Sequence, residues 1–155
     1  MKASERIVRL LVSPGGAKFD RFVVRLAGHS LVSWVFARAE GVPYNPPALL
    51  TTIGSVSGKR RTVVLPTFVA SGKLCVVGSR GGLPSDPYWA RNLRAEPRGW
   101  IRAKRRLRPV SARFATGEER EALWKSITAE APIYLEYQGR ARAHREIPVI
   151  VLSDA

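Results

Sequence analysis

The sequence predicts a mainly β domain with flanking helices, an α+β protein built on a small barrel of about six mostly antiparallel strands. Short apolar runs rich in β-branched residues are separated by turns of hairpin length. Most of these runs have no helical pattern between them, as a doubly wound parallel sheet would require. A chain of 155 residues is the size of one ordinary domain. We expect the barrel to occupy residues 48–155 and a helical segment to occupy residues 1–47.

The first third of the chain predicts helices. Apolar residues at helical spacing indicate one amphipathic helix over about 17–39, and a shorter one is expected over 4–12. The apolar residues of the longer pattern are Phe19, Phe22, Val23, Leu26, Leu31 and Trp34. A cluster of prolines at Pro43, Pro46 and Pro47 then marks a linker.

Strand patterns alternate with turn signals through the rest of the chain. Strands are expected at 48–54, 61–70 and 73–79, near 98–104 and 107–114, and at 147–152. A helix over 88–95 should have Asp86 as its N-cap and Pro87 at its first position. A capping box from Thr116 to Glu119 should open a helix over 118–131, and a turn or short helix should follow at 132–138.

The charge balance points to an anionic partner, because 26 basic residues stand against 12 acidic ones and give a net charge of +14. The basic residues gather at 59–61, between 91 and 108, and at Arg140, Arg142 and Arg145. The single cysteine, Cys75, excludes an internal disulfide and a cysteine-rich metal site, and no metal is expected. No apolar run reaches the ~18 residues that cross a bilayer, and the chain begins without a signal-peptide pattern. We therefore expect a cytoplasmic protein.

Two loops have compositions suited to binding. The stretch TTIGSVSGKRRT (51–62) combines glycines and hydroxyls with three consecutive cations, which is typical of a cradle for phosphate or carboxylate. The stretch VGSRGGLPSDPYWARN (77–92) combines small residues, which let a flat ring approach the backbone, with two aromatic residues at a helix start. His29 and His144 lie in no ligand or triad spacing, so an enzyme activity would rest on a bound cofactor.

These segments also carry a resemblance. TTIGSVSGKRRTVVLP, VVGSRGGLPSDPYWARNLRAEP, PIYLEYQ and REIPVIVL resemble, in order and spacing, segments of the deazaflavin-dependent nitroreductase family of actinobacteria. The resemblance implies a split β-barrel similar to flavin reductases and other FMN-binding barrels. It also implies binding of coenzyme F-420, an 8-hydroxy-5-deazaflavin with a phosphorylated oligoglutamate tail. The implied activity is hydride transfer to an electron-poor small-molecule acceptor, such as a quinone, an enone or a nitroaromatic.

The resemblance assigns site residues position by position. Those implied for the coenzyme tail are Ser55, Val56, Ser57, Arg61, Thr62, Val63, Val64 and Leu65. Those implied for the ring are Val77, Gly78, Ser79, Arg80, Tyr88, Trp89, Ala90, Arg91, Asn92 and Tyr134. We take Tyr134 and Ser79 as the candidates for hydrogen bonding or proton delivery to the acceptor.

The chain departs from the family pattern at several of these positions. Ser55 and Val56 replace a basic pair, so tail contacts are expected at Lys59, Arg60 and Arg61 instead. Pro66, also counted among the coenzyme-binding residues, and Ala131 replace aromatic residues of nitroimidazole-reducing relatives. We therefore expect a quinone or an enone to be a better acceptor than a nitroimidazole.

Other interpretations remain open at this stage. The same barrel could bind FMN, haem or a fatty acid. A nucleic-acid-binding barrel would use RGWIRAKRRLRPV (98–110), but Trp100 is its one aromatic residue for stacking, so no nucleic acid partner is expected. The sequence does not decide between a monomer and a homodimer, or whether the N-terminal helices make a peripheral contact with the inner face of the cell membrane.

Overall fold

The computed structural model describes residues 14–40, 46–103 and 105–155, and its strands form one antiparallel sheet of seven strands. The strands are β1 (Pro47–Ile53), β2 (Arg60–Pro66), β3 (Phe68–Ala70), β4 (Lys73–Val77), β5 (Arg98–Ala103), β6 (Arg106–Phe114) and β7 (Val149–Asp154). Their order across the sheet is β2-β1-β5-β6-β7-β4-β3. The predicted antiparallel barrel with flanking helices is confirmed.

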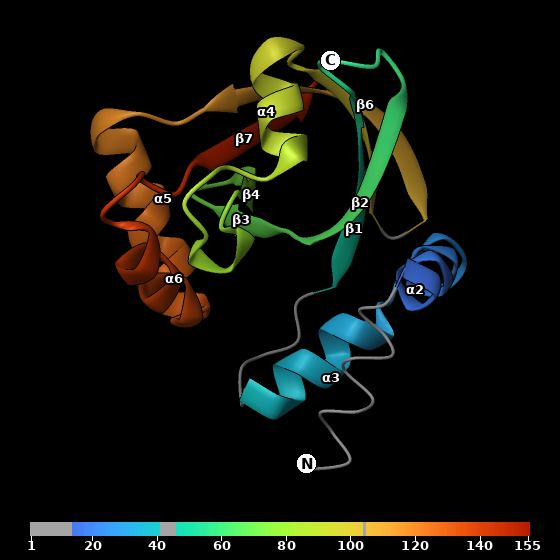
Figure 1. Ribbon diagram of the computed structural model, residues 1–155, viewed down its shortest axis with the longest axis horizontal. Coiled ribbons are helices and arrows are strands. Elements are labelled where there is room, and N and C mark those ends of the chain that lie inside the picture. The colour runs from blue at the N-terminus through green and yellow to red at the C-terminus, as the bar shows by residue number, and fades with distance from the viewer. Residues whose placement is uncertain (1–13, 41–45, 104) are drawn as a thin grey trace.

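The sheet curls because its two edge strands are neighbours in the chain. Strands β2 and β3 lie at opposite edges of the sheet order, yet only Thr67 separates them. A flat sheet of this order could not be spanned by one residue, so the edges must approach each other and form a half-barrel (Figure 1). The strand predicted over 61–70 is therefore two strands, which raises the count from about six to seven.

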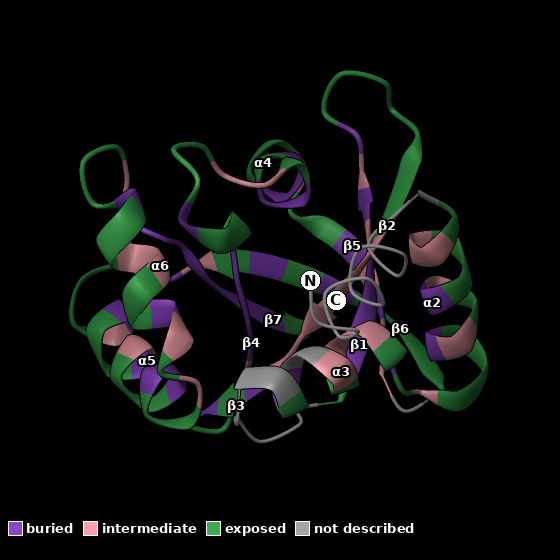
Figure 2. Cartoon of the chain, turned by 60° about the horizontal axis from the view of Figure 1, so that its bottom comes forward, coloured by how far each residue is buried: buried purple, intermediate pink, exposed green. Residues whose placement is uncertain are grey.

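The core has two layers because β4 and β7 are buried on both faces. Val149 and Val151 of β7 pack with residues of α5 (Gly117–Glu130) and α6 (Ile133–Ala141). Ile150 and Leu152, which point to the other face, pack inside the curl of the sheet under α4 (Tyr88–Ala95). The continuous apolar ending of the chain follows from this double burial, which is visible in Figure 2.

The single helix predicted over 17–39 was wrong. The chain forms α2 (Pro14–Ala27) and α3 (Leu31–Glu40), separated at Gly28, whose φ is +73°. The Ser30 hydroxyl donates to Asp20 Oδ2 at 2.7 Å and accepts from Ser33 N–H at 2.9 Å, so a side-chain cap restarts the helix. The helix predicted over 4–12 and the linker proline Pro43 lie outside the described residues.

Two predicted helix caps were also wrong. Asp86 does not cap α4, which begins at Tyr88 after Pro87, because its carboxylate pairs with Arg145 and Arg94. Thr116 precedes α5 as predicted, but its side chain makes no capping hydrogen bond. The Glu119 carboxylate binds Lys73 and Arg113 instead of reaching back to the helix start. In each case the carboxylate forms ion pairs with cations outside the helix start, Arg145 for Asp86, and Lys73 and Arg113 for Glu119.

The Glu119 ion pairs predict a pH-dependent contribution to stability. Hydrogen bonds from Arg113 and Lys73 lower the pKa of this carboxyl from 4.5 to about 2. A carboxyl whose pKa is lowered on folding stabilises the fold above its unfolded pKa, and this contribution is lost as the pH falls through the folded pKa. We expect Glu119→Gln to lower the urea midpoint at pH 6, and the gap to the wild type to narrow below about pH 4.5 and close near pH 2.

The control is Glu118→Gln, which removes the same charge at the neighbouring exposed position outside this cluster. A gap between wild type and Glu119→Gln that is the same at pH 6 and pH 3 would contradict the assignment.

Candidate functional site

A pocket of about 750 Å³ opens between the β1–β2 turn and the start of α4. Its lining consists of Gly54, Ser55, Val56, Ser57, Arg61, Thr62, Val63, Arg80, Pro87, Tyr88, Trp89 and Asn92. All of these residues except Val63 come from the two stretches whose compositions predicted binding, 51–62 and 77–92. The fold brings the stretches together because α4 closes the mouth of the half-barrel beside the β1–β2 hairpin (Figure 1).

Asn92 fixes the β1–β2 turn against α4. Its buried amide oxygen accepts a hydrogen bond from Ser55 N–H at 3.0 Å, and its amide nitrogen donates to Thr52 Oγ1 at 3.0 Å. Within the turn, Gly58 adopts a φ of +64° and donates to the Gly54 carbonyl at 2.8 Å. The ligand-facing turn is therefore held from its own backbone and from the helix opposite.

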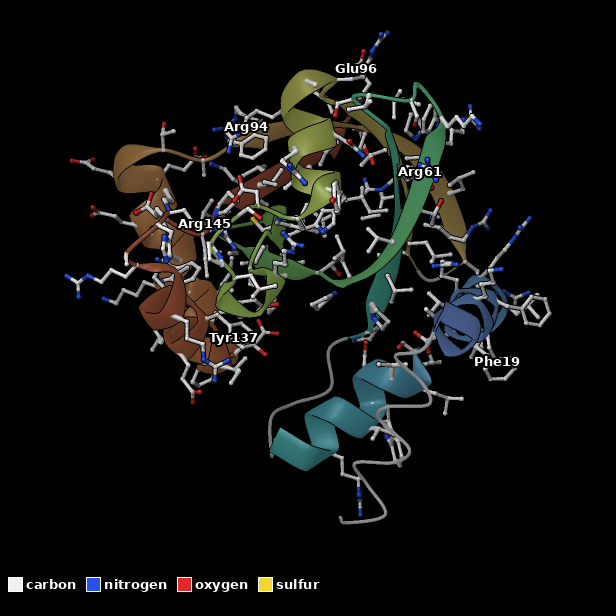
Figure 3. All side chains as sticks on the ribbon, viewed as in Figure 1. Phe19, Arg61, Arg94, Glu96, Tyr137 and Arg145 are labelled. Carbon is white, nitrogen blue, oxygen red and sulfur yellow. The ribbon has the colours of Figure 1, made fainter. Side chains whose placement is uncertain are left out.

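Arg145 fixes the other wall of the pocket. Its guanidinium donates from Nε to the Leu83 carbonyl at 2.9 Å and from Nη2 to the Ser79 carbonyl at 2.7 Å. Nη1 donates to the Gly78 carbonyl at 3.0 Å and to Asp86 Oδ1 at 2.8 Å. The loop from 78 to 87, which supplies Arg80 and Pro87 to the lining, is thus held by one side chain from the segment before β7 (Figure 3).

The pocket is cationic and partly aromatic. Arg61 and Arg80 are among its lining residues, which include no aspartate or glutamate. The ring of Tyr88, 71% exposed, has the Arg91 guanidinium 4.3 Å from its centroid and the Arg80 guanidinium at 5.8 Å. A planar ligand that carries negative charge matches this combination of a flat face and guanidinium groups.

Comparison with known proteins identifies the family. Residues 31–154 match the family described as "F420H(2)-dependent quinone reductase". The chain belongs to this family. An F420H(2)-dependent quinone reductase of Mycobacterium tuberculosis is 33% identical over 117 residues, which cover 72% of this chain and 76% of the relative. The chain is therefore an oxidoreductase of a family that depends on reduced coenzyme F-420.

Solved structures agree with this membership. The structure of an F420-H2-dependent reductase, FDR-A, is 38% identical, covers 70% of this chain and 94% of its own, and superposes with a TM-score of 0.61. A structure described as a domain-swapped dimer is 35% identical, covers 80% of this chain and all of its own, and superposes with a TM-score of 0.62. The haem storage protein HutZ of Vibrio cholerae shares the fold at 12% identity and a TM-score of 0.52.

Ten of the residues predicted to bind the coenzyme line the pocket of this quinone reductase family member. They are Ser55, Val56, Ser57, Arg61, Thr62, Val63, Arg80, Tyr88, Trp89 and Asn92. The predicted residues outside the lining are Lys59, Arg60, Val64, Leu65, Pro66, Val77, Gly78, Ser79, Ala90, Arg91 and Tyr134. Arg60 lies apart because its guanidinium stacks over Trp100 at 4.2 Å. Val77 and Ala90 are buried core residues of β4 and α4.

Two glycines of the second loop, Gly78 and Gly82, are required by the packing of the fold. A Cβ on Gly78 would lie 2.8 Å from Pro148 Cγ, and one on Gly82 would lie 2.6 Å from the Tyr137 carbonyl oxygen. Gly82 also has a φ of +82°. Both glycines are thus required by contacts of the loop with Pro148 and Tyr137. The expectation that they let a flat ring approach the backbone stays a prediction.

The two residues predicted to be catalytic lie outside the pocket lining. Tyr134 is 7% exposed and packs edge-on against Phe68, with ring centroids 5.6 Å apart, and against Tyr137 at 5.8 Å. Burial raises the pKa of its phenol well above the ordinary value, so the group stays protonated. Ser79 is half-buried and its carbonyl accepts from Arg145. The catalytic role of both residues stays a prediction.

Sequence reasoning missed the part that Arg145 plays. The residue was noted only as one of several cations and as part of a family motif. No local pattern distinguished it, because Arg145 stands among other basic residues and Glu146, one residue nearer to β7, has a side chain that is 68% exposed. The identity of its partners, 59 to 67 residues away in the chain, could not be read from the sequence.

The arrangement predicts that the guanidinium of Arg145 is needed for both stability and coenzyme binding. We expect Arg145→Lys to lower the free energy of unfolding by about 2 kcal/mol, because one ammonium group cannot reach four acceptors and leaves part-buried carbonyls unpaired. The released loop should also weaken binding of F-420, measured by titration of the oxidised coenzyme.

Arg94→Lys is the matched control, since Arg94 pairs with the same Asp86 carboxylate at 3.3 Å but is 57% exposed. It should change stability by less than about 0.5 kcal/mol. Equal effects of the two substitutions would show that the buried hydrogen bonds of Arg145 do not hold the loop.

Proposed function

We propose that the pocket between the β1–β2 turn and α4 binds the anionic part of coenzyme F-420, and that the protein reduces a quinone with it. One observation carries this proposal: the pocket combines two arginines, two serine hydroxyls and two aromatic side chains with no carboxylate in its lining. Family membership names the coenzyme, and the charge pattern of the pocket matches its phosphate and carboxylates.

The residues present fit such a ligand. Arg61 and Arg80 can each donate two parallel hydrogen bonds to a phosphate or carboxylate, and Ser55 and Ser57 can add hydroxyl donors. Trp89 and Val63 provide apolar surface for a part of the ligand without charge. The volume of about 750 Å³ lies within the usual range of small-molecule sites, roughly 300–1,000 Å³.

When bound, reduced F-420 supplies a hydride from C5 of its deazaflavin ring. The chain has three tasks around that transfer. The arginines hold the charged end of the coenzyme and so fix its position along the pocket. The loop held by Arg145 and the turn held by Asn92 keep this position constant during the reaction. Hydrogen-bond donors stabilise the negative charge that develops on the quinone oxygen, and Tyr134 and Ser79 are the donors proposed from the sequence.

The first test of the function compares neighbouring arginines. We expect Arg61→Ala to weaken binding of F-420 by about 10- to 100-fold, because a charge-assisted hydrogen bond contributes roughly 1.5–3 kcal/mol. The loss should shrink at high salt, since Arg61 is exposed and its interaction is screened. In steady-state quinone reduction, KM for reduced F-420 should rise while kcat changes little.

Arg60→Ala removes the same charge at the next position, where the guanidinium lies over Trp100 outside the pocket lining. It should leave binding within about twofold. Titration of FMN in parallel tests the alternative coenzyme. Equal losses from the two variants, or binding of FMN as tight as that of F-420, would contradict the proposal.

We further propose that the N-terminal helices rest on an anionic membrane surface at the cytoplasmic side. The apolar residues of the amphipathic pattern are exposed, at 54% for Phe19, 58% for Phe22 and 54% for Leu26. Phe19 points away from the sheet in Figure 3. With Leu31 and Trp34, which are 43% and 49% exposed, they form what we call the N-terminal apolar face. No helix in the described part of the chain is long and apolar enough to cross a bilayer.

Charge favours a lipid surface as the occupant of this face. A cavity of about 430 Å³ beside Phe22 has Arg21, Arg25 and Arg102 in its lining and no acidic residue. The Arg38 guanidinium lies 5.8 Å from the ring centroid of Trp34. Apolar side chains surrounded by cations are typical of segments that lie in the interface of anionic membranes.

Vesicle flotation tests the membrane contact. The wild type should float with phosphatidylglycerol vesicles, less so with phosphatidylcholine vesicles or at high salt. The double variant Phe19→Ser and Phe22→Ser should bind at least about tenfold less, because burying each phenylalanine contributes about 1.5–3 kcal/mol.

Val69→Ser, which alters an apolar residue 72% exposed on β3, serves as the control and should bind as the wild type does. A second copy of the chain is the competing occupant, because a structure 35% identical to this chain is described as a domain-swapped dimer. A wild type that is dimeric, ignores vesicles and becomes monomeric in the double variant would overturn the membrane contact.

A further inference from the structure

A second cavity, which we call the α5–α6 groove, lies away from the coenzyme pocket and shares no residue with its lining. Its volume is about 420 Å³. The lining consists of Arg120, Trp124, Leu135, Gln138, Gly139, Arg142, Arg145 and Glu146. Three of these residues are arginines and one is an acid, so the groove is cationic overall. Nothing in the proposed reductase function uses it.

The floor of the groove is rigid. The Gln138 amide donates to the Arg145 carbonyl at 3.2 Å and accepts from Ile147 N–H at 2.8 Å. Arg120 Nη2 donates to the Ile147 carbonyl at 2.9 Å. These bonds connect α5, α6 and the segment before β7. A ligand would therefore meet a preformed surface, which keeps the entropy cost of binding low.

Arg120 is the unusual residue of this floor. It is 9% exposed, and its Nε atom is buried and makes no hydrogen bond in the described part of the chain. Glu146 Oε2 lies 3.1 Å from Nε but outside hydrogen-bonding geometry, and the Glu146 side chain is 68% exposed. A buried guanidinium is thus neutralised by a poorly aligned, solvent-facing carboxylate, although a well-aligned carboxylate would satisfy both its charge and its donor.

Apolar surface lies beside this charge. The Arg120 guanidinium is 5.0 Å from the ring centroid of Trp124, and Leu135 is 54% exposed. A Cβ built on Gly139 would have no atom within 4 Å, so space remains open above the helix at this point. Arg142 is exposed, and its guanidinium provides a second cation in the lining.

We propose that the α5–α6 groove binds a small carboxylate whose planar apolar part lies against Trp124, and that Glu146 competes for the anion position beside Arg120. The ligand carboxylate replaces that of Glu146, which turns outward into water with its charge intact. Arg142 provides the second contact to the incoming carboxylate. The volume limits the ligand to a small molecule and excludes a large part of a macromolecule.

Benzoate is the probe that tests this site, measured by calorimetric titration of the full chain in a buffer free of phosphate and carboxylate. Glu146→Gln should bind benzoate about tenfold more tightly than the wild type, because the internal competitor has lost its charge while keeping its shape. Arg142→Ala should bind about tenfold more weakly, the effect of one charged contact. Acetate, which lacks the ring, should bind more weakly than benzoate.

Matched controls come from the exposed face of α6. Glu136 and Arg140 form an i,i+4 pair at 3.7 Å, 64% and 61% exposed, outside the lining of the groove. Glu136→Gln and Arg140→Ala remove the same charges as the test variants and should leave the dissociation constant within twofold. Equal effects of Glu146→Gln and Glu136→Gln would overturn the site, because they would reflect overall charge alone. Loss of the benzoate signal in Arg61→Ala, with no change in Arg142→Ala, would assign the probe to the coenzyme pocket and also overturn it.

Discussion

The buried guanidinium of Arg145 is the interaction on which the geometry of the coenzyme pocket depends. Arginine has five N–H donors in a rigid fork, and here the fork reaches three carbonyls and one carboxylate. Removing a guanidinium from water is costly, and the cost is offset only when its donors are satisfied and its charge is paired. Asp86 supplies the charge and the loop carbonyls supply the remaining acceptors. The loop is thus held in the conformation in which its carbonyls and Asp86 accept the hydrogen bonds of Arg145.

This anchor also connects the two cavities. The side chain of Arg145 holds the loop that forms one wall of the coenzyme pocket, while the same residue belongs to the lining of the α5–α6 groove. Its backbone carbonyl accepts the hydrogen bond from Gln138 that fixes the groove floor. The same residue thus uses its side chain to hold the pocket loop and its backbone carbonyl to hold the groove floor.

Local patterns predicted most of the fold, and long-range partners explain what they did not. The hairpin turns followed from glycine and serine at positions that require positive φ, and the structure has Ser71 and Gly72 at +50° and +72°. The break between β2 and β3 does have a local signal in Pro66, which cannot donate to a ladder and favours a strand end, but the strand formers on both sides led to one predicted strand. The predicted helix caps at Asp86 and Thr116 were wrong because of partners that are distant in the sequence. A carboxylate near a helix start is a capping candidate in the sequence, but arginines distant in the chain compete for it in the fold.

The N-terminal helices show that periodicity predicts an amphipathic helix but not the direction in which its apolar residues face. The helical spacing of apolar residues is present in α2. Val24 and Asp20 are buried on its inner side, whereas Phe19 and Phe22 are more than half exposed. Asp20 is 4% exposed and accepts from the Ser30 hydroxyl and from Val32 N–H, so this buried acid joins α2 to α3. Because the polar Asp20–Ser30 contact occupies the inner side of α2, the larger apolar side chains lie on its outer side. Their exposure to water is unfavourable. The membrane contact proposed above would account for this arrangement, because an anionic and apolar phase would cover the phenylalanines and lie beside Arg21, Arg25 and Arg102.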